Sequence, residues 1–336
     1  MKEVKLAFFV LVLVSFYLVF LYLALSTGKL LHWKGFKGSE PWLKARYVPK
    51  AGDVPTAKHT KSHIRVFCWI TTQEQALNTK IPALNETWVR RCDNKIFIMT
   101  TNATKPGHSI IDFHIKDGRK RLTKKTIAAM KYIYEHYLKD YDWFLKADDD
   151  TYIVMENLKY LLSFYNPDEA VYLGHLFKMF LNPGYMSGGA GYVLSRHAVR
   201  RLVEQGYNVK GACRKGGRYE DVDLAICLKK VGVPVYSSLD NTGRETFYPL
   251  NLGDYIMGTL PKQLHLYDRH SAKTGMMCCS KLSISFHKVT PRDIRMLEFL
   301  LYRAAVYGRD IDWTQFKHFF KAETEPPLPT GNRTEE

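Results

Sequence analysis

The chain has 336 residues and a formal net charge of +16. Such a charge often accompanies nucleic-acid binding, but here the basic residues are spread along the chain and form no single block interleaved with aromatic residues. We therefore exclude nucleic acid as the partner and expect an anionic small substrate, such as a nucleotide phosphate, or membrane headgroups.

The N-terminal segment predicts a membrane anchor. Leu6 to Leu25 is a run of twenty residues without a charge, which is long enough to cross a bilayer as one helix. A cleaved signal peptide is the alternative, but its apolar core is normally shorter, at about 7 to 15 residues. We favour the uncleaved anchor, with residues 1–5 as a cytoplasmic tail and residues 26–61 as a stem. Lysines flank both ends of the span, so charge alone does not set its orientation.

Sequons and cysteines favour a lumenal or extracellular body for the rest of the chain. Sequons begin at Asn85, Asn102 and Asn332, although such triplets also arise by chance. Six cysteines fit an oxidising compartment, and they fall into three pairs that are close in sequence. We predict disulfides between these pairs, with other pairings or free buried thiols as the alternatives. The predicted bridges are Cys68–Cys92, Cys213–Cys227 and Cys278–Cys279.

Residues 62–308 alternate between strand and helix patterns, which predicts one α/β domain. The helix expected near 122–138 has an apolar stripe at three- and four-residue steps for packing on a sheet. The expected elements are strands at 65–71, 95–100, 143–146, 171–177 and 233–238, and helices near 77–91, 122–138, 195–204 and 221–231. Residues 241–261 look turn-rich, and the tail at 309–336 is expected to be partly disordered.

Three consecutive carboxylates follow the apolar strand that starts at Trp143. Asp148, Asp149 and Asp150 would repel one another unless a cation or strong hydrogen bonds lay among them. A hard cation such as Mn²⁺ or Mg²⁺ prefers such oxygen ligands and often also binds substrate phosphates. The alternative is a set of acids at a helix N-terminus. Open α/β sheets bind ligands at the carboxyl ends of their strands, so we favour a metal site here.

A glycine-rich turn at 184–191 is the next notable motif. Its spacing matches neither the Walker phosphate loop nor the dinucleotide fingerprint, so we exclude both. Glycine also allows a backbone to approach other groups closely, and we expect close approach to a ligand or to the sheet.

Ordered blocks along residues 65–307 together resemble the core 1 β1,3-galactosyltransferases. The blocks are Arg65 to Thr71, Glu86-Thr87-Trp88, Arg91-Cys92, Asp117-Gly118-Arg119, Lys125-Thr126, Trp143 to Tyr152, Gly184 to Leu194, Glu220-Asp221, Glu245-Thr246-Phe247, Cys278-Cys279-Ser280 and Ser285-Phe286-His287. The resemblance implies a GT-A glycosyltransferase fold and a single-pass type II protein of the Golgi membrane with a lumenal catalytic domain. It also implies the inverting transfer of galactose, with Mn²⁺, from UDP-galactose to the 3-hydroxyl of GalNAc on a glycoprotein. A homodimer is compatible with it.

The resemblance assigns roles to the acidic triplet and to a distant histidine. Asp148, Asp150 and His287 would ligate the metal, and Asp149 would hold the ribose or sugar of the donor. A lone histidine is more often structural, so the role of His287 depends on the resemblance. Further contacts to UDP-galactose are assigned to Thr71, Asp117, Arg119 and Lys125.

An inverting transfer needs a base that takes the proton of the acceptor hydroxyl. The block resembling that of the family places Asp221 in this role, at a predicted helix start where the helix dipole stabilises a carboxylate. Glu220 would bind the acceptor or support the base. Asp223 is a competing candidate, and a plain acid in a first helical turn is the structural alternative.

One segment departs from the family pattern. Where the family has several Trp and Tyr residues near the acceptor, residues 263–270 read Gln-Leu-His-Leu-Tyr-Asp-Arg-His. Two alternatives therefore stay open: a related β1,3-glycosyltransferase with another donor or acceptor, and a non-catalytic, chaperone-like relative. The second is disfavoured because such relatives are expected to lose the metal-binding carboxylates, which this chain keeps.

Overall fold

The computed structural model describes residues 43–44, 64–99 and 109–306. No helix within these ranges is both long and apolar enough to cross a membrane. The anchor expected at Leu6 to Leu25, most of the stem and the tail at 309–336 lie outside them, as do the sequons at Asn102 and Asn332.

The described residues build an eight-stranded mixed sheet in the order β1-β11-β7-β10-β5-β2-β3-β4. Strand β10 runs antiparallel to both of its neighbours, β5 and β7, whereas the other pairings are parallel. The strands are β1 (Leu43–Lys44), β11 (Val235–Tyr236), β7 (Tyr172–Gly174), β10 (Tyr192–Ser195), β5 (Trp143–Asp148), β2 (Val66–Thr71), β3 (Asn94–Ile98) and β4 (Ile110–Ile111). The α/β class predicted from the sequence is confirmed.

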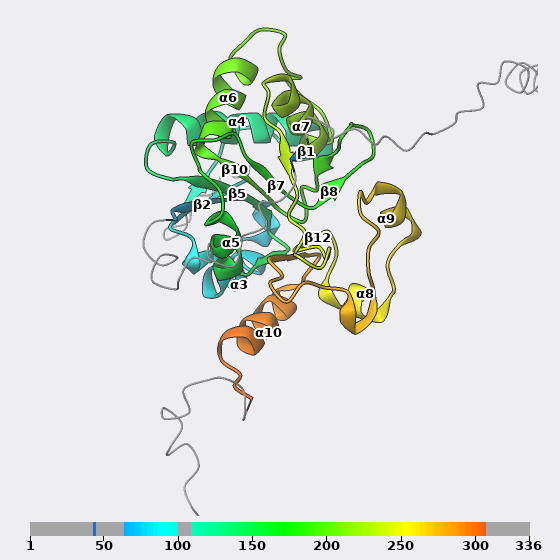
Figure 1. Ribbon diagram of the computed structural model, residues 1–336. Coiled ribbons are helices and arrows are strands. Elements are labelled where there is room, and N and C mark those ends of the chain that lie inside the picture. Colours follow the sequence, from blue (N-terminus) through cyan, green and yellow to red (C-terminus); the bar gives the residue numbers. More distant parts are fainter. Residues whose placement is uncertain (1–42, 45–63, 100–108, 307–336) are drawn as a thin grey trace, which may run out of the picture. The chain divides into compact units, whose positions relative to one another are not determined.

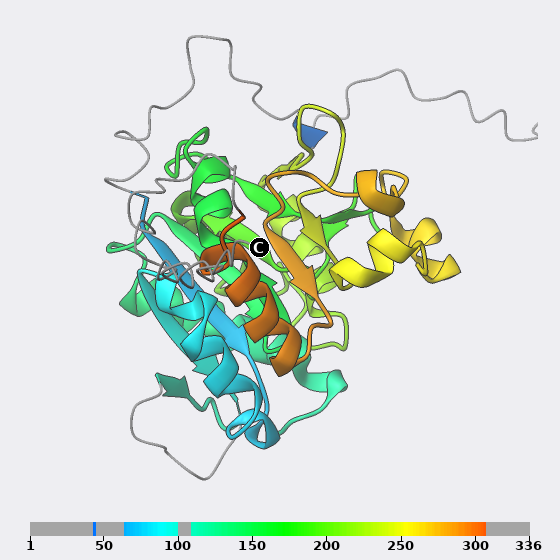
Figure 2. The same ribbon diagram turned by 90° about the horizontal axis from the view of Figure 1, so that it is seen from below.

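Alternation along β2 explains why both faces of the sheet are covered by helices. Val66, Cys68 and Ile70 point into one hydrophobic cluster, while Phe67 and Trp69 point into another. Helices α3 (Lys80–Glu86), α5 (Met155–Leu162) and α10 (Pro291–Tyr302) cover the first side. Helices α4 (Leu122–His136), α6 (Arg196–Arg201) and α7 (Glu220–Lys230) cover the second. The two layers lie on opposite sides of the sheet in Figure 1, and Figure 2 shows α10 and α3 side by side.

The helix expected near 77–91 is in fact three short pieces. They are η1 (Glu74–Ala76), α3 and η2 (Trp88–Arg91). The break is at Thr87, whose φ of −121° and ψ of −123° are not helical. Its hydroxyl donates to the carbonyl of Ala83 at 2.6 Å, and the indole N–H of the buried Trp88 donates to the carbonyl of Thr151 at 3.0 Å. Tertiary hydrogen bonding of Trp88 therefore accompanies the break in an otherwise apolar helical pattern.

Short elements account for the other differences. The strand expected at 171–177 is divided into β7 and β8 (Leu176–Phe177), and the strand expected at 233–238 shrinks to β11. The helix expected at 195–204 becomes α6 followed by a π-helical turn, η4 (Leu202–Tyr207). Elements that were not predicted are β1, β4, α5, β6 (Thr151–Ile153), β9 (Tyr185–Met186), η3 (Arg119–Arg121), β12 (Phe247–Tyr248), α8 (Leu252–Met257), α9 (Lys262–Tyr267), η5 (Gly275–Met277), β13 (Ser285–His287) and α10.

The covalent cross-links agree with the sequence prediction. Cys68 bonds to Cys92, Cys213 to Cys227, and Cys278 to its neighbour Cys279. The first bridge ties β2 to the residue that follows η2. The second ties the loop before α7 to α7 itself.

A buried carboxylate holds α10 against the rest of the domain. Glu298 accepts hydrogen bonds from the guanidinium of Arg91 at 2.7 and 2.9 Å, from Arg90 at 2.9 Å and from the hydroxyl of Tyr152 at 2.9 Å. Burial alone would raise the pKa of Glu298, but the hydrogen bonds from Arg91 and Tyr152 hold it below its ordinary value. Its charge therefore stabilises the docked helix.

We expect Glu298→Gln to lower the free energy of unfolding by about 2 kcal/mol at pH 7, because two guanidinium groups lose their carboxylate. A carboxylate with a lowered folded-state pKa stabilises above its unfolded pKa, and this stabilisation is lost as the pH falls through the folded value. The deficit of the variant should therefore shrink below the ordinary pKa of 4.5. Urea unfolding at pH 7 and pH 4 measures it, with the exposed Glu135→Gln as control. An equal loss in both variants would contradict the assignment.

Candidate active site

Strand β5 delivers Asp148 to the carboxyl end of the sheet, next to Thr71 of β2. Asp148 accepts hydrogen bonds from the hydroxyl of Thr71 and, at 2.7 Å, from the ammonium of Lys146. Lys146 is only 3% exposed. Burial alone would lower the pKa of Lys146, but the carboxylates of Asp148 and Glu220 hold it above its ordinary value. Lys146 is therefore a fixed positive charge behind the acidic triplet.

Asp148, Asp150 and His287 converge on one point. One ligand atom from each lies within 4.8 Å of the others, and Nε2 of His287 is 3.2 Å from Oδ1 of Asp150. Nδ1 of His287 lies 3.0 Å from the carbonyl oxygen of Pro249, which can only accept, so Nδ1 donates and Nε2 is left to face the carboxylates. Two carboxylates and an imidazole oriented in this way fit a divalent cation.

Asp149 lies outside this group of three. It is buried, and its two oxygens accept from the ammonium of Lys80 at 2.5 Å and from the hydroxyl of Thr72 at 2.8 Å. Lys80 is also 4.0 Å from Oδ2 of Asp150. The triplet is thus flanked by two cations, Lys80 and Lys146, which the sequence analysis did not single out. Lys80 is a single lysine far from the triplet along the chain, and only the fold brings it to Asp149. Lys146 lies two residues before Asp148 on the same face of β5, so the alternation of a strand could have signalled it.

The glycine-rich turn passes between the group of three and helix α7. A Cβ added to Gly189 would lie 2.2 to 2.8 Å from the ring atoms of His287, and one added to Gly188 would lie 2.5 Å from Oε1 of Glu220. The hydroxyl of Thr151 donates to the carbonyl of Gly189 at 2.9 Å. The turn therefore makes the close backbone approach that its glycines predicted, and what it approaches are side chains of the site.

We expect Gly189→Ala to weaken binding of a divalent cation by about 10- to 100-fold, because the new methyl group would displace the imidazole of His287. Isothermal titration with Mn²⁺ measures the affinity, and circular dichroism checks that the fold is kept. Gly253→Ala in α8 is a matched control, because its Cβ would meet only Oδ1 of Asn251, at 3.1 Å. Unchanged affinity in Gly189→Ala would remove His287 from the ligand set.

Asp221 lies on the other side of the same turn, in the first turn of α7. Its carboxylate accepts from the backbone N–H of Gly188 at 3.1 Å and from that of Val222 at 2.9 Å. Burial raises the pKa of Asp221, and these two N–H groups partly offset the rise. Gly188 also accepts a hydrogen bond from Lys146 at 2.9 Å, so one backbone unit links the metal-side residues to Asp221.

The two neighbouring acids are held elsewhere. Glu220 is buried against the hydroxyls of Tyr192 and Thr126, at 3.1 and 3.2 Å. Burial raises the pKa of Glu220 to about 7. Asp223 accepts from the hydroxyl of Thr123 at 2.7 Å and from the guanidinium of Arg214 at 3.3 Å. Of the three acids, Asp221 is the most accessible, although still partly buried, and in the described part of the chain its hydrogen bonds come from backbone N–H groups alone.

Known proteins similar to this chain identify its family. Residues 61–320 match the model of the Fringe-like family. The chain belongs to that family. It is 35% identical over 279 residues to glycoprotein-N-acetylgalactosamine 3-beta-galactosyltransferase 1 of Xenopus laevis, which covers 80% of this chain and 76% of the relative. This confirms the resemblance on which the sequence analysis relied.

Two further relatives are less similar to the chain and are longer. A beta-1,3-glucosyltransferase of Mus musculus is 27% identical over 223 residues, covering 65% of this chain and 42% of the relative. Chondroitin sulfate synthase 3 of Homo sapiens is 29% identical over 185 residues, covering 50% and 20%. The names of these two relatives describe different products, so the substrate of this chain has to be argued from the site.

The predicted donor contacts of this Fringe-like chain are only partly brought together. The hydroxyl of Thr71 donates to Asp148, which belongs to the proposed metal-binding group with Asp150 and His287. Asp117 forms an ion pair with the buried Lys125, and Arg119 begins η3. Within the described ranges, no hydrogen bond or ion pair joins Asp117, Arg119 or Lys125 to the acidic triplet. Their role at the donor stays a prediction.

An exposed aromatic surface next to Asp221 was missed by the sequence analysis. Phe180 and Tyr219 are 62% and 55% exposed, and their rings stack with centroids 6.3 Å apart. Tyr267 packs edge-on against Phe180 at 5.9 Å. Phe180 has a φ of +68°, a strained value for a residue with a side chain. The three rings come from distant segments, so no local sequence pattern signals them.

Proposed function

We propose that this chain is an inverting, metal-dependent glycosyltransferase with a GT-A fold, which moves galactose from UDP-galactose to the 3-hydroxyl of GalNAc on Ser or Thr of a glycoprotein. The observation that carries the proposal is the placement of Asp221 across one glycine turn from the group of Asp148, Asp150 and His287. The similarity to the Xenopus glycoprotein-N-acetylgalactosamine 3-beta-galactosyltransferase 1 supports the choice of galactose and GalNAc.

The donor set of the proposed metal site favours Mn²⁺. Two carboxylates suit a hard divalent ion, and an imidazole nitrogen is accepted by transition metals such as manganese. A cation held there would offset the negative charge that develops on the diphosphate as UDP leaves. The chain's own contribution is orientation: Pro249 fixes the ring of His287, and Thr71 and Lys146 hold Asp148.

In the proposed reaction Asp221 accepts the proton of the GalNAc 3-hydroxyl. As the proton moves, the hydroxyl oxygen forms a bond to the anomeric carbon of galactose, the bond from that carbon to the β-phosphate oxygen breaks, and UDP departs. Attack on the face opposite the leaving group inverts the anomeric configuration. The raised pKa of Asp221 makes it a stronger base than an ordinary carboxylate, while the backbone N–H groups of Gly188 and Val222 keep it oriented.

The aromatic surface of Phe180, Tyr219 and Tyr267 supports an acceptor that carries a sugar. Apolar faces of sugars stack on exposed rings, and Tyr219 lies two residues before Asp221. The backbone N–H of Lys178 donates to the carbonyl of Tyr267 at 2.7 Å, which fixes this side of the surface. Segment 263–270 supplies one of these rings, Tyr267, and Phe180 and Tyr219 from other parts of the chain add the other two.

We expect Phe180→Ala to raise the KM for a GalNAc peptide by about tenfold while the KM for UDP-galactose changes little, because in the proposed complex this ring would contact the acceptor and not the donor. Steady-state kinetics with each substrate varied in turn measure the two constants. Phe299→Ala on α10 is a control of similar exposure, at 55%. A rise in both KM values would show general damage, and no rise in either would remove Phe180 from the acceptor site.

We further propose that the protein is a single-pass type II protein of the Golgi membrane with this domain in the lumen. The uncharged run from Leu6 to Leu25 and the three disulfides support this localisation and orientation. A chaperone-like role without catalysis is less well supported, since the carboxylates needed for metal binding and proton transfer are all in place.

Release of UDP tests the proposed function. The purified chain is given UDP-galactose and Mn²⁺ with a GalNAc-Thr peptide, and compared with the same peptide lacking GalNAc, with EDTA, and with UDP-glucose. Turnover that needs galactose, GalNAc and metal together is the expected result. A folded protein that binds UDP and turns over only UDP-glucose, or only another acceptor, would replace the proposed substrates. No turnover with any pair would contradict the enzyme.

A further inference from the structure

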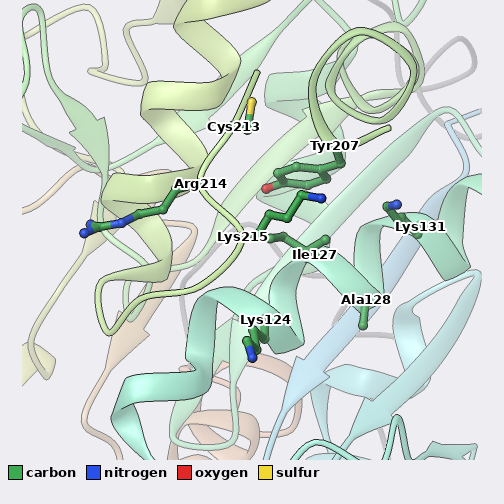
Figure 3. Close-up of a pocket in the computed structure, with 8 residues that line it drawn as sticks. All are labelled: Lys124, Ile127, Ala128, Lys131, Tyr207, Cys213, Arg214 and Lys215. Carbon is green, nitrogen blue, oxygen red and sulfur yellow. The ribbon is translucent and has the colours of Figure 1, made fainter. Parts of the chain in front are cut away.

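A second concave region lies on the helical layer that contains α4. It is a pocket of about 320 Å³ between α4, the π-helical turn η4 and the loop that follows Cys213. Figure 3 shows Lys124, Ile127, Ala128 and Lys131 along one face of α4, with Tyr207 and Lys215 opposite them. The apolar part of the lining comes from Ile127, Ala128 and the aromatic ring of Tyr207.

The pocket carries four positive charges and little to balance them. Lys124 and Lys131 are two helical turns apart, about 10 Å along the axis, and Lys215 lies opposite them on the loop. The guanidinium of Arg214, in the same loop, points away from α4 in Figure 3. Arg214 is 3.3 Å from Asp223. In the part of the chain that the structure describes, Lys124, Lys131 and Lys215 form no ion pair. Cations gathered without counter-charges raise the local potential and attract an anion.

The pocket is connected to the candidate base. Thr123, which precedes Lys124, donates its hydroxyl to Asp223, and Arg214 contacts the same carboxylate. Asp223 lies two residues after Asp221, and the loop from Arg214 to Tyr219 leads directly into α7. A polypeptide whose sugar reached Asp221 would therefore pass its flanking residues near the pocket.

We infer that this pocket binds carboxylate side chains of the acceptor polypeptide, a few residues from its GalNAc-bearing Ser or Thr. The inference rests on the proposed function and adds a preference for acidic acceptors. An extended peptide with two or three carboxylates spread over about 10 Å matches the spacing of Lys124 and Lys131. Exposed ion pairs are individually weak and are screened by salt, so the preference should be moderate and salt-dependent.

Two GalNAc-Thr peptides that differ only in three Asp or three Asn residues near the sugar test the preference. With the native chain at low salt, we expect the KM of the Asp peptide to be about tenfold lower than that of the Asn peptide, and the difference to shrink at 300 mM NaCl. A triple variant with Lys124, Lys131 and Lys215 changed to Gln should lose the difference and keep its kcat on the Asn peptide. Arg214 is left unchanged because it contacts Asp223.

A matched triple variant removes the same charge away from the pocket, with Gln at the exposed Lys139, Lys281 and Arg303. It should keep the preference, and equal losses in both triple variants would show an effect of net charge and overturn the pocket. Equal KM values for the two peptides in an active native chain would also overturn it. If no GalNAc peptide is turned over, the proposed function fails. The pocket is then tested separately by fluorescence anisotropy with a labelled Asp peptide that carries no sugar. Binding that is lost only in the pocket variant would support the site. Binding of a sulfated glycan without discrimination between the peptides would contradict it.

Discussion

Replacing Asp150 by alanine is expected to reduce kcat/KM for metal-dependent transfer by about a thousandfold or more. Asp150 faces Nε2 of His287 at 3.2 Å and shares with Asp148 the point where a cation would be bound. Loss of one carboxylate from a set of three protein ligands removes both affinity and charge stabilisation of the leaving diphosphate. UDP release is measured over a range of Mn²⁺ concentrations, together with direct Mn²⁺ binding.

The control for this variant is Asp140→Asn, an exposed carboxylate in the turn after α4. It should keep full activity and Mn²⁺ affinity. Asp149→Asn is a second comparison, because Asp149 is bonded to Lys80 and Thr72 outside the group of three. It should retain Mn²⁺ binding. If Asp150→Ala binds Mn²⁺ as tightly as the native chain, the cation does not lie at this group, and the metal site predicted from the triplet is wrong.

Much of the first half of the domain was predictable because its strands are continuous and apolar. The run from Trp143 to Ala147 can only be a buried strand or helix segment, and the three acids after it mark where it must leave the core. The order of alternating elements then placed the acids at the carboxyl edge of a sheet, and β5 ends at Asp148. The sequence could not supply the position of Lys80, which lies 69 residues before Asp149. Lys146, two residues before Asp148 on the same face of β5, was present in the sequence signal and overlooked.

The second half was harder because many of its elements are too short to show a period. Strand β12 has two residues and α8 and α9 have six each, less than two full helical turns. Helix α10 is different, since its signal was present and overlooked. Thr290 caps it in a capping box with Asp293, and Pro291 occupies the first turn. The position of His287 beside the triplet depends on β13 pairing with β6, a contact between residues far apart in sequence.

Asp221→Asn is the variant that separates the proposed base from its neighbours. It should lower kcat by about 10²- to 10⁴-fold, because asparagine keeps the size of the side chain but cannot take a proton. Mn²⁺ and UDP affinities should change little, since Asp221 lies across the glycine turn from the metal-side residues.

Asp223→Asn should instead keep most of kcat and lower the free energy of unfolding by about 1 kcal/mol, because it weakens the contacts to Thr123 and Arg214. Single-turnover transfer and urea unfolding of both variants measure these effects. If Asp223→Asn lost most of its kcat at normal stability while Asp221→Asn stayed active, the base would be Asp223. Helix α7 would then have to rotate, because Asp223 is bonded to Thr123 and could not otherwise reach an acceptor.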